Sequence, residues 1–272
     1  MKTRKEPALT IGTAIALFGL FTAAPGSSLT GLRAVQAATT GTSQGLAAID
    51  AAARSGKYLF VFFWKSHDEQ SRTMYGVFQS ATSKWAEAAD SIGIQITDPR
   101  EKPVVDKFDV SRAPMPLVVA IAPNGAVTKG FPIKFDENQL REGFVSPCTA
   151  QCLKALQDRK LVLLCVQNEK TQFSQVAWSG AQDFKADARF AAATEVVPLN
   201  PEDQREAVLL RELQVDPRTP QAVTVLLAPP GQPVAKFAGA VTKEQLVAEL
   251  AAAKSGPCAG GKCGPGGCGP KK

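Results

Sequence analysis

Cysteine is absent from the first 147 residues of this chain, and histidine occurs only once, as His67. The missing cysteines exclude a dithiol active site from the first half, because disulfide exchange needs a thiolate and a second, resolving thiol. The single histidine excludes a multi-histidine metal site within one chain. All six cysteines follow residue 147: Cys148, Cys152, Cys165, Cys258, Cys263 and Cys268.

Long hydrophobic runs are also missing after residue 24. The long run that exists, Ile11 to Ala24, has 14 residues and follows a short basic head, whereas a membrane-spanning helix needs about 20. Small residues lead from it to Ala37 and Ala38, which is the pattern of a secretory signal peptide over residues 1–37. We therefore expect export to a periplasm, cell envelope or extracellular space. The alternative is an uncleaved segment that anchors the chain in a membrane.

An excess of charge of one sign is lacking as well. The formal net charge is +6, from 31 Lys and Arg against 25 Asp and Glu, and it falls to +3 because four basic residues and one acidic residue leave with the signal peptide. The sequence contains no dense Lys/Arg stripe with interleaved aromatic residues. Nothing therefore predicts a nucleic-acid partner.

The first half alternates between helical and strand patterns. Residues 58–64 form a continuous aromatic and aliphatic run, typical of a strand covered on both faces. The flanking patterns predict the order αβαβαββα, with Asn124-Gly125 as a hairpin turn. The expected elements are helices over 45–54, 72–89, 103–108 and 136–144, and strands over 58–64, 92–96, 117–121 and 126–131.

The second half repeats the first at a nearly constant offset. Residues 160–166 repeat the first apolar strand 103 residues later, and Ala228-Pro229-Pro230-Gly231 repeats Ala122-Pro123-Asn124-Gly125 at an offset of 106. Pro220 repeats Pro114 at that same offset. We expect a signal peptide over 1–37, similar domains over 38–146 and 147–255, and a flexible Cys/Gly-rich tail over 256–272.

The first repeat resembles the thioredoxin family. It has the family's Phe-Trp pair at the end of a core strand, as Phe63-Trp64, and an X-Pro segment at the spacing of the family's cis-proline, as Ala113-Pro114. The resemblance implies an α/β fold with two thioredoxin-like three-layer domains in tandem. It also implies that the backbone at Ala113 and Pro114 borders a groove for an extended peptide.

The loop where thioredoxins carry Cys-Gly-Pro-Cys has no cysteine here. Asp68 and Ser71 stand at the two cysteine positions, and His67 precedes them. Ser71 cannot form a thiolate near neutral pH, whereas Asp68 is a good acceptor at a helix start. We interpret the loop as a vestigial active site with capping chemistry. The alternative is that His67, Asp68 and Glu69 bind a metal or act as acid and base.

Cys148 and Cys152 form the most informative cysteine pair. Ser146-Pro147 predicts a helix start, which places Cys148 in a first turn where the helix dipole favours a thiolate. Residues i and i+4 have Cβ atoms about 5–6 Å apart, against about 3.8 Å in a relaxed disulfide. A structural disulfide in a loop, a redox pair or metal clamp, and inert free thiols all remain open. Cys165, inside an apolar strand, is expected to be a buried small hydrophobe.

The tail carries Cys258, Cys263 and Cys268 among Gly and Pro, a composition that cannot supply a packed core. Such a chain could wrap its thiolates around a soft metal, Cu or Zn. The alternative is a flexible tail whose cysteines form disulfides. Because the tail has three cysteines, an odd number, at least one of them would pair with a cysteine outside the tail, for example in a partner protein. No other cofactor is expected.

Two classes of function follow. The favoured one is an exported, non-enzymatic protein that binds a peptide, a protein partner or a metal, and that meets a membrane only through an uncleaved signal segment. The alternative is a thiol-disulfide oxidoreductase whose redox pair is Cys148 and Cys152, or lies in the tail.

Overall fold

The computed structural model describes residues 43–254, which divide into two compact units, 43–145 and 146–254. Each unit is described by itself below. The expected signal peptide and the cysteines of the tail lie outside the described residues. Among the helices of residues 43–254, none has the length and apolar character that crossing a membrane requires.

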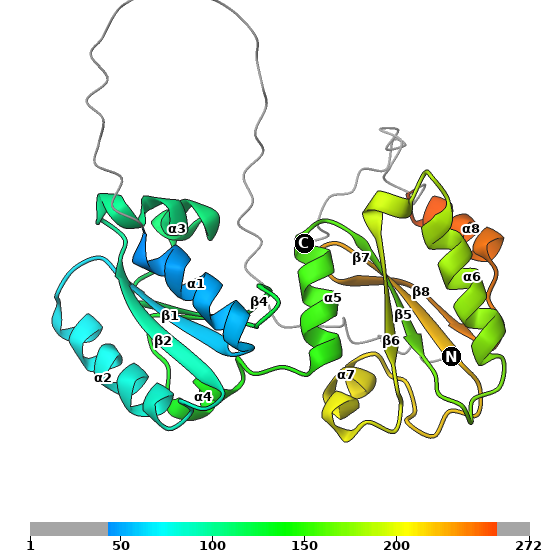
Figure 1. Ribbon diagram of the computed structural model, residues 1–272, viewed down its shortest axis with the longest axis horizontal. Helices are drawn as coiled ribbons and strands as arrows, with labels where there is room; N and C mark the ends of the chain where they lie inside the picture. Colours follow the sequence, from blue (N-terminus) through cyan, green and yellow to red (C-terminus); the bar gives the residue numbers. More distant parts are fainter. Residues whose placement is uncertain (1–42, 255–272) are drawn as a thin grey trace, which may run out of the picture. The chain divides into compact units, whose positions relative to one another are not determined.

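The first unit contains four strands with helices between them (Figure 1). Asn124-Gly125 connects its last two strands, and Gly125 has a positive φ of 82° as such a turn requires. The elements in chain order are α1 (Gln44–Ser55), β1 (Tyr58–Trp64), α2 (Glu69–Ser83), β2 (Ala89–Gln95), α3 (Lys102–Lys107), β3 (Leu117–Ile121), β4 (Val127–Pro132) and α4 (Glu137–Arg141).

The strand order of the first sheet is β2-β1-β3-β4, with β1 and β2 parallel and the other neighbours antiparallel. Alternate residues of β1 point to opposite faces. On one face, Leu59, Val61 and Phe63 contact α1 and α3. On the other, Phe60 and Phe62 contact α2 and α4. Since both faces are covered, β1 is buried almost throughout, as its uninterrupted apolar sequence predicts.

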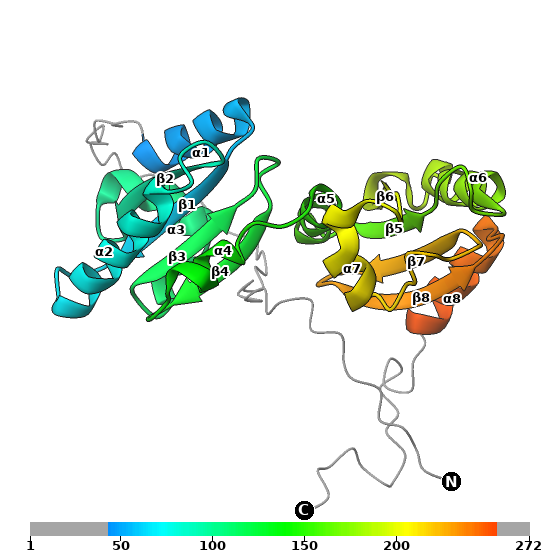
Figure 2. The same ribbon diagram turned by 90° about the horizontal axis from the view of Figure 1, so that it is seen from below.

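The second unit repeats this plan, and its four strands can be followed in Figure 2. Its first helix begins at Pro147 with Ser146 as N-cap, which confirms the helix start that the sequence predicts. The elements are α5 (Pro147–Gln157), β5 (Leu161–Val166), α6 (Ser174–Ala186), β6 (Thr194–Leu199), α7 (Ala207–Glu212), β7 (Val223–Ala228), β8 (Gln232–Ala238) and α8 (Lys243–Lys254).

The second sheet has the order β6-β5-β7-β8, again with a parallel first pair and antiparallel neighbours after it. Helices α5 and α7 cover one face, and α6 and α8 cover the other. Cys165 is buried against α6, as a small apolar side chain. Both units therefore have the three-layer α/β architecture that the resemblance implies.

Three expected elements differ in their bounds by three residues or more: the strand over 92–96 is Ala89–Gln95, the helix over 136–144 is Glu137–Arg141, and the helix over 72–89 differs most. The helical pattern predicts a helix over 72–89, but α2 spans Glu69–Ser83, and β2 begins at Ala89. The apolar residues Trp85 and Ala88 continue the helical spacing, yet they form a turn in which the Trp85 carbonyl accepts from the Ala88 and Ala89 N–H groups. That turn lets the chain reverse and pair with β1.

Candidate functional site

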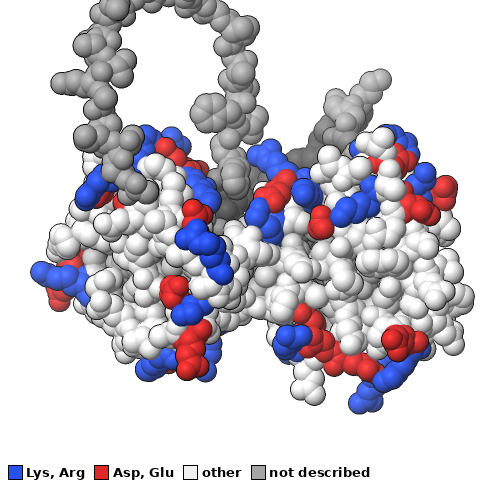
Figure 3. Space-filling model, viewed as in Figure 1, with Lys and Arg blue, Asp and Glu red and all other residues white. Residues whose placement is uncertain are grey.

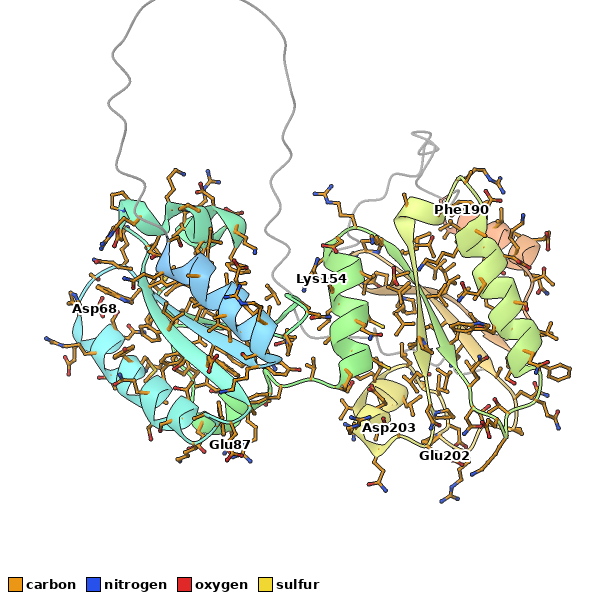
Figure 4. All side chains as sticks on the ribbon, viewed as in Figure 1. Asp68, Glu87, Lys154, Phe190, Glu202 and Asp203 are labelled. Atoms are coloured by element: carbon orange, nitrogen blue, oxygen red, sulfur yellow. The ribbon has the colours of Figure 1, made fainter. Side chains whose placement is uncertain are left out.

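The loop after β1 holds the residues at the expected vestigial active site. Asp68 lies at the start of α2 (Figure 4), where its Oδ1 accepts a hydrogen bond of 2.7 Å from the Ser71 N–H. The Ser66 hydroxyl donates to the other carboxylate oxygen, at 2.6 Å. These bonds hold the pKa of Asp68 below its usual value, the Ser66 hydroxyl being the largest cause. The capping interpretation of Asp68 is thereby confirmed.

His67 is exposed and stands over the half-buried Trp64, with 4.2 Å between the ring centroids and an interplanar angle of 45°. No group of three or more His, Cys, Asp or Glu side chains within residues 43–254 is placed to hold a metal. A metal site built on His67, Asp68 and Glu69 therefore has no geometric support.

The cis-proline position is corrected by the structure. The peptide bond from Met115 to Pro116 is cis, and Ala113-Pro114 is not among the cis bonds of the described residues. The family's spacing, counted from Val110, matches its cis-proline to Pro114. In the structure a 3-10 turn spans Val110–Arg112, and the cis bond lies two residues after that position, directly before β3.

The backbone beside this cis bond is open in the first unit. Among residues 43–254, neither the N–H nor the C=O of Met115 has a hydrogen-bond partner. The Met115 side chain contacts the core, which fixes the backbone in place. A donor and an acceptor of the main chain are thus presented without a partner, and backbone groups of this kind are satisfied by water or by another strand.

Ile133 lies next to this open backbone. Its N–H donates to the Pro116 carbonyl at 2.7 Å, and its own carbonyl accepts from Gln70 of α2 at 3.2 Å. Ile133 has a φ of +67° and is 45% exposed. A β-branched residue at positive φ is a genuine outlier, and such outliers are found at binding sites.

In the second unit, a segment of the same chain pairs with the backbone on either side of the residue that corresponds to Met115. Gly239 donates to the Ala222 carbonyl at 2.7 Å, as Ile133 does to Pro116, so the two positions correspond. There the Gln172 N–H donates to the Pro220 carbonyl, and the Ala222 N–H donates to the Gln172 carbonyl, both at 2.9 Å. Gln172 forms a parallel bridge with Gln221. These bonds flank Gln221, which corresponds to Met115, and the Gln221 carbonyl accepts from the Thr219 hydroxyl at 2.8 Å. In the first unit, Pro116 stands where Ala222 donates and has no N–H.

Cys148 and Cys152 are free thiols one turn apart on the continuous helix α5. Cys152 is buried, and the thiol of Cys148 donates to the Pro198 carbonyl at 3.2 Å. Burial, and next the carboxylate of Glu206, raise the pKa of Cys148 to about 12. Burial also raises the pKa of Cys152 to about 12. The thiolate of Cys148 expected from the helix dipole is not favoured, because burial and then the Glu206 carboxylate at the helix start both raise the pKa of this thiol.

Two buried carboxylates were missed by the sequence analysis. Glu101 accepts from the Ser43 hydroxyl at 2.7 Å and from the Gln44 and Gly45 N–H groups at 2.8 and 3.1 Å. Glu206 in the same way accepts from the N-cap serine of α5 and from the Cys148 N–H. Each carboxylate ties the first helix of its unit to the loop after the second strand.

The sequence feature that could have identified these two glutamates is a repeated Asp-x-Arg-Glu motif, at 98–101 and at 203–206. In each copy the Asp caps a 3-10 turn and binds the Arg side chain, and the Glu that follows is buried. Figure 4 labels Asp203, which lies before α7. The role of the motif is to position helices.

Surface charge adds no second site. On the face that Figure 3 shows, Lys and Arg alternate with Asp and Glu of the described residues, without an extended area of one sign. Exposed acidic groups of the described residues pair with basic ones, as in Lys170 with Glu202 at 2.8 Å. The proposed tail ligands Cys258, Cys263 and Cys268 lie outside the described residues.

Comparisons with known proteins bear on the fold. No protein-family model and no curated protein matches the sequence. Among solved structures, the thioredoxin Deadhead of Drosophila melanogaster is 18% identical, over 37% of this chain and 89% of that one, with a TM-score of 0.30. Thioredoxin O2 of Arabidopsis thaliana is 14% identical, over 36% and 81%, with a TM-score of 0.30.

A two-domain structure is similar over more of the chain. The first two thioredoxin domains of Saccharomyces cerevisiae Eps1p are 9% identical, over 68% of this chain and 86% of that one, with a TM-score of 0.27. These neighbours are thioredoxin-fold proteins. The likeness concerns the fold alone. The predicted α/β class with two three-layer domains is confirmed by the helices and by the strand order and directions of each sheet.

Proposed function

We propose that this thioredoxin-like chain is an exported, non-catalytic binding protein whose first unit takes up an extended peptide segment of a protein partner. The segment adds alongside Met115, pairing its main chain with the free N–H and C=O of that residue. A hydrophobic side chain of the peptide contacts the exposed Ile133. Export is proposed from the basic head and apolar run that precede residue 37.

The observation that carries this proposal is the unpaired main chain of Met115 in the first unit. The N–H and C=O of Met115 have no partner within residues 43–254, whereas the carbonyl of Gln221, the corresponding residue of the second unit, accepts from the Thr219 hydroxyl at 2.8 Å. Main-chain pairing with an extended peptide supplies affinity, and adjacent side chains supply specificity. The strained, exposed Ile133, where the second unit has Gly239, gives the open edge an apolar contact.

A catalytic role receives no support from the residues described. Neither active-site loop contains a cysteine. Cys148 and Cys152 have pKa values near 12, so few thiolates exist at neutral pH for an attack on a disulfide. The alternative of a thiol-disulfide oxidoreductase would therefore rest on the tail cysteines.

The proposal is tested by selecting binders from a random 12-residue peptide library on the full chain. Selection is repeated with Ile133→Asp and with Phe173→Asp as the matched control. Phe173 is 49% exposed and has a φ of +63°, so the two sites share exposure and backbone conformation, and aspartate tolerates the left-handed region.

The proposal expects extended hydrophobic peptides whose affinity falls at least about 10-fold in Ile133→Asp, because a charge then faces the apolar contact. Phe173→Asp should bind them as the parent chain does. Peptides that lose affinity with Phe173→Asp and not with Ile133→Asp would place the binding edge on the second unit and contradict the proposal.

A further inference from the structure

The first unit has a pocket on the side of α2 that faces the edge strand β2. Its volume is about 320 Å³, and it lies entirely within this unit. It is separate from the Met115 backbone, which is on the β3 side of the sheet. The lining residues are Phe62, Trp64, His67, Ser71, Arg72, Tyr75 and Gly93.

The pocket exists because β2 has a glycine where it faces β1. Gly93 is the register partner of Phe62, so a side chain at this position would stand beside the Phe62 ring. A Cβ placed on Gly93 would meet the Tyr75 ring at 3.4 Å. In the second unit the corresponding pair is Cys165 and Pro198, and Pro198 carries a side chain.

Aromatic rings form most of the wall. Phe62 and Tyr75 meet edge to face, with 5.2 Å between centroids and an interplanar angle of 66°. Trp64 and His67 form the other side. A cavity of this size, between aromatic rings, fits a planar apolar group of one or two rings.

The polar element of the pocket is Arg72. Its guanidinium has no ion pair or hydrogen bond with any residue in 43–254. The nearby Asp68 uses its carboxylate oxygens on the Ser66 hydroxyl and the Ser71 N–H. An unpaired guanidinium beside aromatic walls selects an anion, and its planar fork matches a carboxylate. The same cation disfavours an ammonium ligand.

We infer that this pocket binds an aromatic carboxylate, with the ring between Phe62, Trp64 and Tyr75 and the carboxylate on Arg72. A free aromatic acid has both an aromatic ring and a carboxylate, and so does a peptide whose C-terminal residue is aromatic. The site does not depend on peptide pairing at Met115.

The test is isothermal titration calorimetry on the full chain with phenylacetate, with neutral phenylacetamide, and with Gly-Gly-Phe as free acid and as amide. The inference expects a Kd below about 1 mM for phenylacetate or Gly-Gly-Phe, and at least about 10-fold weaker binding of the matching amide. Binding of phenylacetate but not Gly-Gly-Phe identifies a free acid, and the reverse identifies a peptide terminus.

Variants locate the site. Arg72→Gln should weaken the acid at least about 10-fold, while Arg54→Gln on α1 makes the same change of charge elsewhere and should leave the affinity unchanged. Gly93→Val should abolish binding by filling the pocket, with an unchanged or raised melting temperature, because valine favours a strand more than glycine does. Equal binding of acid and amide, or full binding by Gly93→Val, would overturn the inference.

Discussion

Replacing Ile133 by glycine and by alanine separates backbone strain from side-chain contact. Both substitutions remove the same apolar contact, so their difference reports the backbone at φ +67°. A left-handed conformation costs a non-glycine residue about 1–2 kcal/mol, and glycine loses about 0.5–1 kcal/mol through its freedom in the unfolded chain. We expect Ile133→Gly to be more stable than Ile133→Ala by about 0.5–1 kcal/mol.

The assay must report on the first unit alone, because unfolding of two units is not a single two-state transition. Amide hydrogen exchange of the buried β1 strand, measured on the full chain, gives that free energy. The control is Ala51→Gly on the exposed face of α1, where glycine should be less stable than alanine by about 1 kcal/mol.

The sign of the glycine effect thus reverses between positions 133 and 51. Equal or lower stability of Ile133→Gly relative to Ile133→Ala would refute the left-handed strain at Ile133. It would also remove one of the two supports for a binding edge there. Both variants should bind a selected peptide with similarly reduced affinity, since the loss comes from the missing side chain.

Two further predictions concern packing and thiol chemistry. Gly180→Ala should destabilise the second unit by about 1–3 kcal/mol, because its Cβ would lie 2.0 Å from the Val241 carbonyl oxygen. Gly76→Ala on α2 meets nothing within 4 Å and should stabilise the first unit by about 0.4–1 kcal/mol. Amide hydrogen exchange of the buried strands β5 and β1, respectively, measures each change. Cys148 and Cys152 should react with iodoacetamide at pH 7.5 at least about 100-fold more slowly in the native than in the urea-unfolded chain. Rapid native labelling, read by mass spectrometry, would contradict the burial of Cys152 and the raised pKa of Cys148.

Local patterns were sufficient for much of the fold. The apolar run from Tyr58 to Trp64 predicts β1 at its observed bounds, because a strand covered on both faces needs no polar alternation. The period of 103 to 106 residues predicts a second unit of the same plan, which the matching strand orders confirm. Ser146-Pro147 predicts the start of α5, since serine and proline act within one helical turn.

The site was less predictable because its key contacts join residues far apart in sequence. Burial, and then Glu206 from 58 residues away, raise the pKa of Cys148, the reverse of the expected effect. Backbone pairing by Gln172 leaves no pattern in the sequence, because any residue can form it. Spacing placed the cis-proline at Pro114, two residues before the cis bond that precedes β3.

The most direct test of the open binding edge is amide hydrogen exchange at single-residue resolution. In the free chain, the Met115 amide should exchange rapidly, and the hydrogen-bonded Ala222 and Gln172 amides should exchange slowly. A saturating amount of a library-selected peptide should slow Met115 at least about 10-fold and leave the other two unchanged. A Met115 amide that is already protected in the free chain, or that stays fast with the peptide bound, would contradict the account.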